Sequence, residues 1–170
     1  GRAHIVYTHD PVEWSEDAEE GDIRYISSAG PPYETWSTPV TVNDDGMERA
    51  QGYAAVEVQH GGDTPALVHV IWEDSRLSPE APIEFPNSSN LYYDIFYARK
   101  PGTYPFFSLN IRVSEASSIT DYIFTGDYID LAANPTLLFA IWTDRRDKTD
   151  IFDFEDDVYG SRIVPGGAVP

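Results

Sequence analysis

The sequence predicts an all-β protein made of repeated antiparallel sheets, and three sets of matching segments carry this prediction. VHVIWEDSR at 68–76 recurs as LFAIWTDRR at 138–146, with its Trp, Asp and Arg each 70 positions further on. DIRYIS at 22–27 recurs as DIFYAR at 94–99, and STPVTVN at 37–43 recurs as SLNIRVS at 108–114, 72 and 71 positions later. Such a period indicates stacked sheets, because one small sheet cannot bury its face alone.

The first group of expected strands occupies about residues 4–43. HIVYT at 4–8 is a short β-rich run, and the acidic stretch EWSEDAEEG that comes soon after it is expected to be a loop. DIRYIS and PVTVN at 39–43 supply two more strands, and the second ends in the turn residues NDDG. This group lacks one strand of the next group.

The second group, about residues 51–115, supplies four expected strands, YAAVEV, LVHVIWED, YYDIFYAR and LNIRVSE. Polar and apolar residues alternate at 56–58 and 110–113, as expected for strands with one covered face. VHVIW is more continuously apolar and is expected to lie between two layers. Three prolines in eight positions exclude a helix from the following loop, LSPEAPIEFPNSSN.

The third group, about residues 127–163, supplies YIDLAA, LLFAIWTD and DVYGSRIV, and residues 164–170 are expected to be a loose tail. This makes ten expected strands and no helix. A period somewhat above the usual 40 to 50 residues favours a β-propeller with loop insertions. The expected fold is therefore a single partial propeller domain over 1–170, whose blades are four-stranded antiparallel sheets.

Composition limits the classes of partner. Apolar residues make up 41% of the 170 residues and aromatic residues 14%, enough for a core in one domain. The 29 acidic residues outnumber the 11 basic ones and give a net charge of −18, which would repel nucleic acids and anionic membranes. Two explanations of this charge stay open: a solvated acidic surface, as in secreted or salt-adapted proteins, and divalent cation binding.

Several kinds of site and segment are excluded by the sequence. The chain has no cysteine, which excludes disulfides, thiolate metal sites and a cysteine nucleophile. No run of 18 apolar residues predicts a membrane helix. The first residues, GRAHIVYTH, match neither an initiator Met nor a signal peptide, so we expect a processed or truncated piece of a longer chain.

These segments together resemble the sialidase-like BNR-repeat, or Asp-box, β-propeller family. The likeness rests on W-x-D-x-R at 72–76 and 142–146, on YDIFYAR and NIRVSE, and on FTGDYIDLAA followed by AIWTDRR, and it spans about residues 4–163. The family's hairpin motif, S-x-D-x-G-x-T-W, is degenerate in SSAGPPYETW and ARKPGTYPFF. Both have lost the Asp-x-Gly centre, so the turn must be made in another way.

The resemblance implies four-stranded blades whose first strand lines a central channel. By this scheme, residues 53–58 and 128–133 form inner strands. A closed propeller has typically four to eight blades, whereas this chain offers about two and a half. The resemblance therefore implies that further blades, from the parent chain or from a second chain, are its partners.

The family's sialidases are implied to use an arginine triad, a Tyr–Glu couple and an Asp acid/base. The early Arg-Ile-Pro signature is absent, and no arginine maps onto the triad, so no catalytic residue is assigned. We expect a fragment or subunit of a secreted or cell-surface propeller that serves as a non-catalytic binding or assembly module. The alternative is part of an exo-sialidase-type glycoside hydrolase that acts on terminal acidic sugars of a glycan.

Candidate binding residues lie at strand ends. An Asp and an Arg two positions apart point to the same side, where they form either a structural ion pair repeated in each blade or a ligand contact. Trp72 and Trp142 are expected to be core anchors. Tyr128 is expected where the chain enters an inner strand, and two orientations stay open for it, one that faces the channel and one that does not. The candidate binding residues are Asp74, Arg76, Asp127, Tyr128, Asp144 and Arg146.

An acidic run near the C-terminus is the candidate metal site. Hard cations such as Ca²⁺ prefer several carboxylate oxygens, although the run lacks the loop pattern of an EF-hand. Solvated loop charge is the other explanation of this run. No zinc-protease pattern and no other cofactor motif is found. The candidate calcium ligands are Asp147, Asp150, Asp153 and Asp156.

Overall fold

The computed structural model describes residues 1–9, 21–46, 49–61, 64–78, 91–120, 128–147 and 156–164, and within these ranges the fold is all-β, without a helix. The predicted fold class is confirmed at this level. None of the described segments is a helix with the length and apolarity needed to cross a bilayer. The strands are β1 (His4–His9), β2 (Asp22–Ser27), β3 (Val40–Thr41), β4 (Gln51–Gly61), β5 (Thr64–Asp74), β6 (Leu91–Pro101), β7 (Ile111–Arg112), β8 (Ser118–Thr120), β9 (Ile129–Ala133), β10 (Leu138–Asp144) and β11 (Asp157–Ile163).

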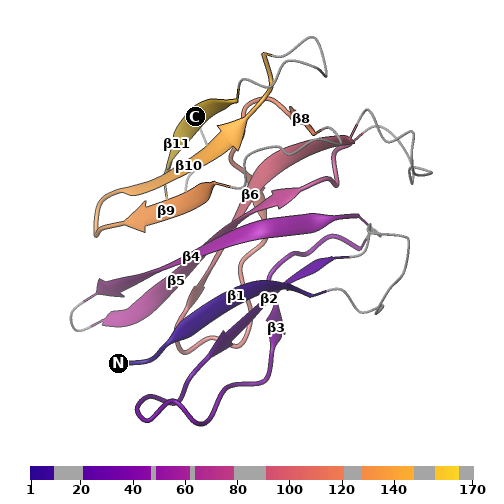
Figure 1. Ribbon diagram of the computed structural model, residues 1–170. Helices are drawn as coiled ribbons and strands as arrows, with labels where there is room; N and C mark the ends of the chain where they lie inside the picture. The colour runs from indigo at the N-terminus through magenta and orange to yellow at the C-terminus, as the bar shows by residue number, and fades with distance from the viewer. Residues whose placement is uncertain are drawn as a thin grey trace.

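The strands form three antiparallel sheets that lie one above another (Figure 1). The first sheet has the order β1-β2-β3, the middle sheet β4-β5-β6-β7, and the third sheet β11-β10-β9. The expectation of ten strands was wrong, because β8 also pairs with β6 and makes the middle sheet five-stranded. The reason is an open edge: β7 covers only Phe96 and Tyr97 of β6, and β8 pairs with the earlier residues 91–93.

The sequence repeat is also a repeat of strand register. Trp72 of β5 lies opposite Phe96 of β6, and Trp142 of β10 lies opposite Tyr159 of β11. In the first sheet Tyr7 of β1 takes the tryptophan position, opposite β2. Each of the three sheets thus contains the same long antiparallel hairpin, formed by β1-β2, β5-β6 and β10-β11.

Strands β4 and β9 are edge strands of their sheets and lie side by side (Figure 1). Both begin at the end of the stack where β5 and β10 finish. β4 contains a bulge, because its register moves from Gly52 opposite Glu73 to Ala55 opposite Ile71. These are the two strands that the resemblance assigned to the channel.

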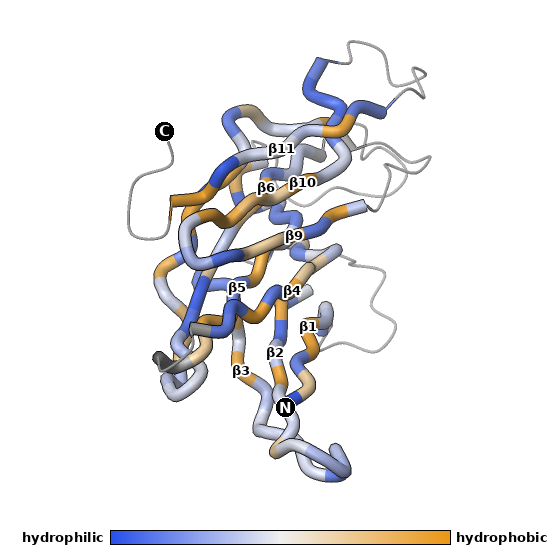
Figure 2. The backbone as a smooth tube through the Cα atoms, turned by 90° about the vertical axis from the view of Figure 1, so that its left-hand side faces the viewer, coloured by the Kyte–Doolittle hydropathy of each residue, from blue (hydrophilic) through white to orange (hydrophobic). Residues whose placement is uncertain are grey.

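The two faces of β5 belong to two different hydrophobic cores, as the apolar run VHVIW predicted. Residues of β4, whose hydropathy is coloured in Figure 2, also divide between the two cores, because Val56 and Val58 pack against one core and Ala55 packs against the other. The core between the first and middle sheets contains Ile23, Tyr25, Val42, Val68, Val70, Trp72, Phe96 and Ala98. The core between the middle and third sheets contains Ile71, Tyr93, Ile95, Tyr97, Val113, Leu131, Leu138, Ala140, Trp142 and Ile163.

The hairpins at 27–36 and 98–107 replace the lost Asp-x-Gly centre with backbone hydrogen bonds. In the first, Tyr33 N donates to Gly30 O at 2.7 Å, and Gly30 has a φ of 117° that favours glycine. In the second, Tyr104 N donates to Pro101 O at 2.9 Å. Each turn is therefore closed without an aspartate.

Candidate functional site

The middle and third sheets each end in the same arrangement, which we name the Trp–Asp–Arg brace. In the middle sheet, Trp72 Nε1 donates to Asp74 Oδ2 at 2.8 Å, and Arg76 N donates to Asp74 Oδ1 at 2.9 Å. The Arg76 guanidinium returns to Asp74 Oδ2 through Nε at 3.0 Å and Nη2 at 2.7 Å. One buried carboxylate thus accepts hydrogen bonds from an indole, a backbone amide and a guanidinium.

The third sheet repeats the brace with the same atoms. Trp142 Nε1 donates to Asp144 Oδ2 at 2.8 Å, and Arg146 N donates to Asp144 Oδ1 at 2.8 Å. Arg146 Nε and Nη2 approach Asp144 Oδ2 at 3.0 and 2.6 Å. Both tryptophans are buried, which confirms their prediction as core anchors.

The brace follows from strand geometry. Residues two apart on a strand share a face, so the indole and the carboxylate meet directly. The chain then turns, and the arginine folds back over the ring that faces the tryptophan from the next strand. Arg76 Cζ lies 4.3 Å from the Phe96 ring centroid, and Arg146 Cζ lies 4.1 Å from that of Tyr159. Hydrogen bonds to Asp144 raise the pKa of Arg146.

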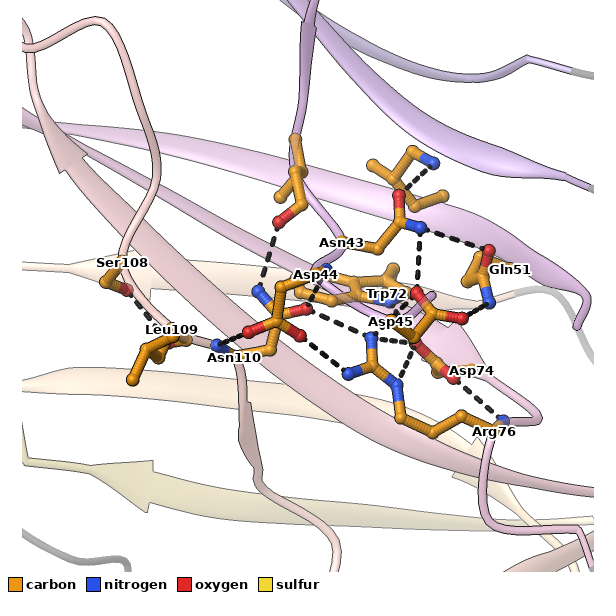
Figure 3. Close-up of polar contacts among 12 residues, drawn as sticks. Asn43, Asp44, Asp45, Gln51, Trp72, Asp74, Arg76, Ser108, Leu109 and Asn110 are labelled. Atoms are coloured by element: carbon orange, nitrogen blue, oxygen red, sulfur yellow. Dashed lines mark hydrogen bonds and ion pairs between the residues drawn. The ribbon is translucent and has the colours of Figure 1, made fainter. Parts of the chain in front are cut away.

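Arg76 also joins the middle sheet to the first (Figure 3). Its Nη1 contacts Asp44 Oδ1 at 2.8 Å, and its Nη2 contacts Asn110 Oδ1 at 3.0 Å and Asp45 Oδ1 at 3.3 Å. Burial alone would lower the pKa of Arg76, but the hydrogen bonds and charges of the aspartates raise it overall. This guanidinium is therefore charged and largely occupied by groups of the chain itself.

Asp44 and Asn110 hold two loops together by reciprocal hydrogen bonds (Figure 3). Asp44 N donates to Asn110 Oδ1 at 2.8 Å, and Asn110 N donates to Asp44 Oδ2 at 2.9 Å. Asn110 Nδ2 also donates to Val42 O at 3.0 Å. The segment after β3 is thus fixed to the segment before β7, which belongs to the next sheet.

Asp45 is a second acid of this network whose side chain is buried, in addition to Asp74. Asn43 Nδ2 donates to its Oδ1 at 2.8 Å, and Gln51 Nε2 donates to its Oδ2 at 2.9 Å. Burial raises the pKa of Asp45 and the charge of Asp74 adds to this effect, while the Asn43 hydrogen bond and Arg76 oppose it. The positive charge of Arg76 therefore helps to keep the Asp45 carboxylate ionised although it is buried.

A histidine–tyrosine pair recurs at matching positions of the first two sheets. His4 Nδ1 lies 2.6 Å from the Tyr25 hydroxyl, and His69 Nδ1 lies 2.8 Å from the Tyr97 hydroxyl. Burial lowers the pKa of His69 to about 4, and the charge of Arg99 contributes. The ring of His69 is therefore neutral at pH 7. The run VHVIW predicted only a strand at His69, and this repeated pair was not predicted.

A pocket of about 210 Å³ opens beside the brace of the middle sheet. Sequence reasoning missed its most exposed residue, Tyr53. The available signal was the match between YAAV at 53–56 and YIDL at 128–131, which places Tyr53 and Tyr128 at equivalent starts of β4 and β9. The pocket is lined by Ala50, Gln51, Gly52, Tyr53, Glu73, Asp74, Ser75, Tyr92 and Tyr93.

The predicted binding residues are found at the same end of the stack. The pairs Asp74–Arg76 and Asp144–Arg146 form within their own sheets. Tyr128 precedes β9 and is 79% exposed. Its backbone carbonyl accepts a hydrogen bond from Thr143 N of β10 at 3.0 Å. Asp127 lies outside the described residues. Ligand contact by these groups and a channel-facing Tyr128 stay predictions.

Two of the four predicted calcium ligands are described, and each has a partner. Tyr159 donates its hydroxyl hydrogen to Asp147 Oδ2, and Asp156 Oδ1 lies 3.2 Å from Arg145 Nε. Asp150 and Asp153 lie outside the described residues. In the described part of the chain, no group of three or more His, Cys, Asp or Glu residues is arranged to hold a metal ion. The calcium site stays a prediction.

Comparisons with models of known protein families and with curated protein sequences find no match to this chain. The likeness to the Asp-box family therefore rests on the motifs of the chain itself.

Proposed function

We propose that the chain is a segment of a sialidase-like β-propeller that acts as a non-catalytic binding and assembly module. The observation that supports this proposal is an open sheet face at one end of the stack. The residues that face the next sheet occupy equivalent strand positions in the first and middle sheets. The third sheet lies at the top of the stack in Figure 1, and no other described sheet covers its upper face. The secreted or cell-surface setting follows from the family resemblance alone.

Equivalent positions differ sharply in exposure. Ile71 of the middle sheet is buried against the third sheet, whereas its equivalent Ile141 in β10 is 42% exposed. Ile95 is also buried in this interface, and its equivalent Val158 in β11 is 78% exposed. Phe139, next to Ile141 on the same face, is 41% exposed. An exposed apolar face of this kind marks an interaction surface.

The opposite end of the stack carries the complementary type of face. In each interface between two sheets, the later sheet in the chain contributes a tryptophan, which is Trp72 from the middle sheet or Trp142 from the third. On the outer face of the first sheet, Tyr7 takes that position, and exposed Ile5 lies on the same face. Two faces of complementary type at opposite ends favour head-to-tail stacking, which closes into a ring when the rotation allows it. The proposed partners are further blades of a longer chain or a second copy.

The engagement of five of the nine arginines supports a non-catalytic role. A sialidase of the family would need three guanidinium groups free to hold one substrate carboxylate. Arg24, Arg76, Arg112, Arg145 and Arg146 all form ion pairs with aspartates of this chain. Release of any of these arginines to a ligand would leave its aspartate without a counter-ion.

The test is the mass of the particle in solution over a range of protein concentrations. The chain has a mass of 19.0 kDa, and we expect multiples of this mass, favoured at high salt because each copy carries a net charge of −18. Ile141→Glu should shift the equilibrium to the monomer. Leu109→Glu, in the exposed segment just before β7 of the middle sheet, should not.

A monomer at every concentration and salt level, with no difference between the two variants, would contradict the assembly proposal. Hydrolysis of a fluorogenic sialoside by this chain would contradict the non-catalytic part and favour the glycoside hydrolase alternative.

A further inference from the structure

A second pocket, of about 420 Å³, opens at the end of the middle sheet opposite the brace. It lies where Leu67 of β5 pairs with Pro101 at the end of β6, beside the connection that leads to β7. Its volume falls in the range of about 300–1,000 Å³ typical of sites for small organic ligands. Three of its described lining residues are aromatic, Tyr104, Phe106 and Phe107. The pocket therefore has room for a ring-sized ligand and an apolar wall to contact it.

Two of these aromatic rings are held largely in water. Tyr104 is 63% exposed and Phe106 is 71% exposed. Both belong to the connection after β6, whose two ends are joined by a pair of hydrogen bonds. Ser108 N donates to Arg99 O at 2.7 Å, and Arg99 N donates to Ser108 Oγ at 3.1 Å. Large apolar side chains that gather in the open beside a pocket mark a binding surface.

Arg99 is the one charged group among the described residues that line this pocket. Its side chain is partly exposed, and its hydrogen bonds within the described part of the chain are made by its backbone. Glu57 of β4 lies in the same row, opposite His69, but two strand spacings separate it from Arg99, about 10 Å. Burial raises the pKa of Tyr97, and the charge of Arg99 partly opposes this increase. The pocket therefore carries a positive charge that none of the described acids neutralises.

Lys100, the next residue along β6, shows how a cation of this region is engaged by the chain itself. Neighbouring residues of a strand point to opposite faces, so Lys100 lies on the face toward the first sheet. Its Nζ donates to Tyr104 O at 3.1 Å and lies 4.9 Å from the ring centroid of Tyr25 and 5.8 Å from that of Phe107. Lys100 thus holds the hairpin in place, whereas the guanidinium of Arg99 is left for a ligand.

We propose that this pocket binds a small carboxylic acid with an apolar ring, in its carboxylate form. The carboxylate pairs with Arg99, because a guanidinium is planar and can donate two parallel hydrogen bonds to a carboxylate. The ring of the ligand packs against Tyr104 and Phe106. An ion pair at a partly exposed site contributes little by itself, so this apolar contact is needed as well. The site does not depend on the proposed stacking, because its lining residues belong to the middle sheet and its connection to β7.

The test is titration of the chain with naphthalene-2-carboxylate, monitored by calorimetry. At physiological ionic strength the net charge of −18 is largely screened beyond about 8 Å, and we expect saturable binding with one site per chain. Naphthalene-2-carboxamide has nearly the same shape without the charge and should bind at least tenfold more weakly. N-acetylneuraminate has the charge without the apolar ring and should also bind at least tenfold more weakly. No saturable binding of the acid, or equal or stronger binding of either comparison compound, would overturn the proposal.

Two charge variants locate the carboxylate. Arg99→Gln should weaken binding of the acid at least tenfold and leave binding of the amide unchanged. Arg162→Gln removes the exposed arginine at the equivalent position of β11 and should change neither. Binding of the acid that survives Arg99→Gln at full strength would refute the site.

Two apolar variants locate the ring. Phe106→Ala should weaken binding of both the acid and the amide. Leu109→Ala removes an exposed side chain of the same connection that does not line the pocket, and should weaken neither. If Arg99→Gln does not fold, Phe106→Ala and the comparison of acid with amide still decide the question. Equal effects of Phe106→Ala and Leu109→Ala would place the ligand elsewhere and refute the pocket.

Discussion

The middle and third sheets share a hairpin register and a Trp–Asp–Arg brace, but their surroundings differ. Arg76 of the middle sheet also contacts Asp44, Asp45 and Asn110, whereas the ion pair of Arg146 within the described residues is with Asp144. The middle sheet is covered on both faces and the third on one. The local sequence therefore determines the backbone of each sheet. Contacts with the adjacent sheets determine how much each residue contributes to the free energy of unfolding.

The largest difference is expected between the two arginines. Arg76→Gln should lower the free energy of unfolding by about 3–5 kcal/mol, because Asp74 and Asp45 would be left buried without their cation. Arg146→Gln should cost about 2 kcal/mol less, since it leaves one buried carboxylate uncompensated instead of two. Urea unfolding of both variants measures this difference. Equal losses would show that the contacts of Arg76 with the first sheet add no stability.

The second difference concerns the equivalent isoleucines, Ile71 and Ile141. Ile71→Ala should cost about 2–5 kcal/mol, because it opens a cavity between two sheets. Ile141→Ala should cost less than about 1 kcal/mol in the monomer, because its side chain is already partly in water. The free energy of unfolding at low protein concentration tests the pair. A loss for Ile141→Ala as large as that for Ile71→Ala would mean that the open face is covered.

The third difference is in pH dependence. His69 has its pKa lowered to about 4 in the folded state, against about 6.5 when unfolded. Below pH 6.5 the unfolded state therefore takes up a proton that the folded state does not, and stability falls as the pH decreases from 6.5 to 4. The loss is on the order of 2–3 kcal/mol, with a further contribution in the same direction from His4, whose pKa is also lowered.

His69→Gln removes this titrating group and should flatten the fall in the urea midpoint between pH 7 and 4.5. In the third sheet, the non-titrating Phe139 occupies the same position and contributes nothing to this dependence. An unchanged slope in the variant would assign the acid sensitivity to carboxylates instead.

Most of the strand pattern was predictable because it depends on local residues. The alternation at 56–58 and the apolar run VHVIW reflect which faces are covered, and the structure places these segments in β4 and β5. β8 was missed because a three-residue strand has too few residues for a period of two to stand out. Its formation depends on the uncovered edge of β6, which the sequence does not display.

The candidate site was predictable only in part. The W-x-D-x-R spacing left two explanations open, a structural ion pair and a ligand contact, and an ion pair is present in both sheets. The contacts of Arg76 with Asp44 and Asn110 join segments far apart in the sequence, so no local spacing predicts them. Tyr53 was missed for a different reason: its exposure depends on a bulge, which is a register shift between strands rather than a residue pattern.

The third sheet has Phe139 and Gly160 at the positions of the histidine–tyrosine pair. A methyl group on Gly160 would lie 2.9 Å from two carbons of the Phe139 ring, so the ring covers the bare backbone of the neighbouring strand. The bulky ring of Phe139 and the absence of a side chain at Gly160 therefore depend on each other. Neither position can drift alone without a clash or a void, and relatives of this repeat should vary there in pairs.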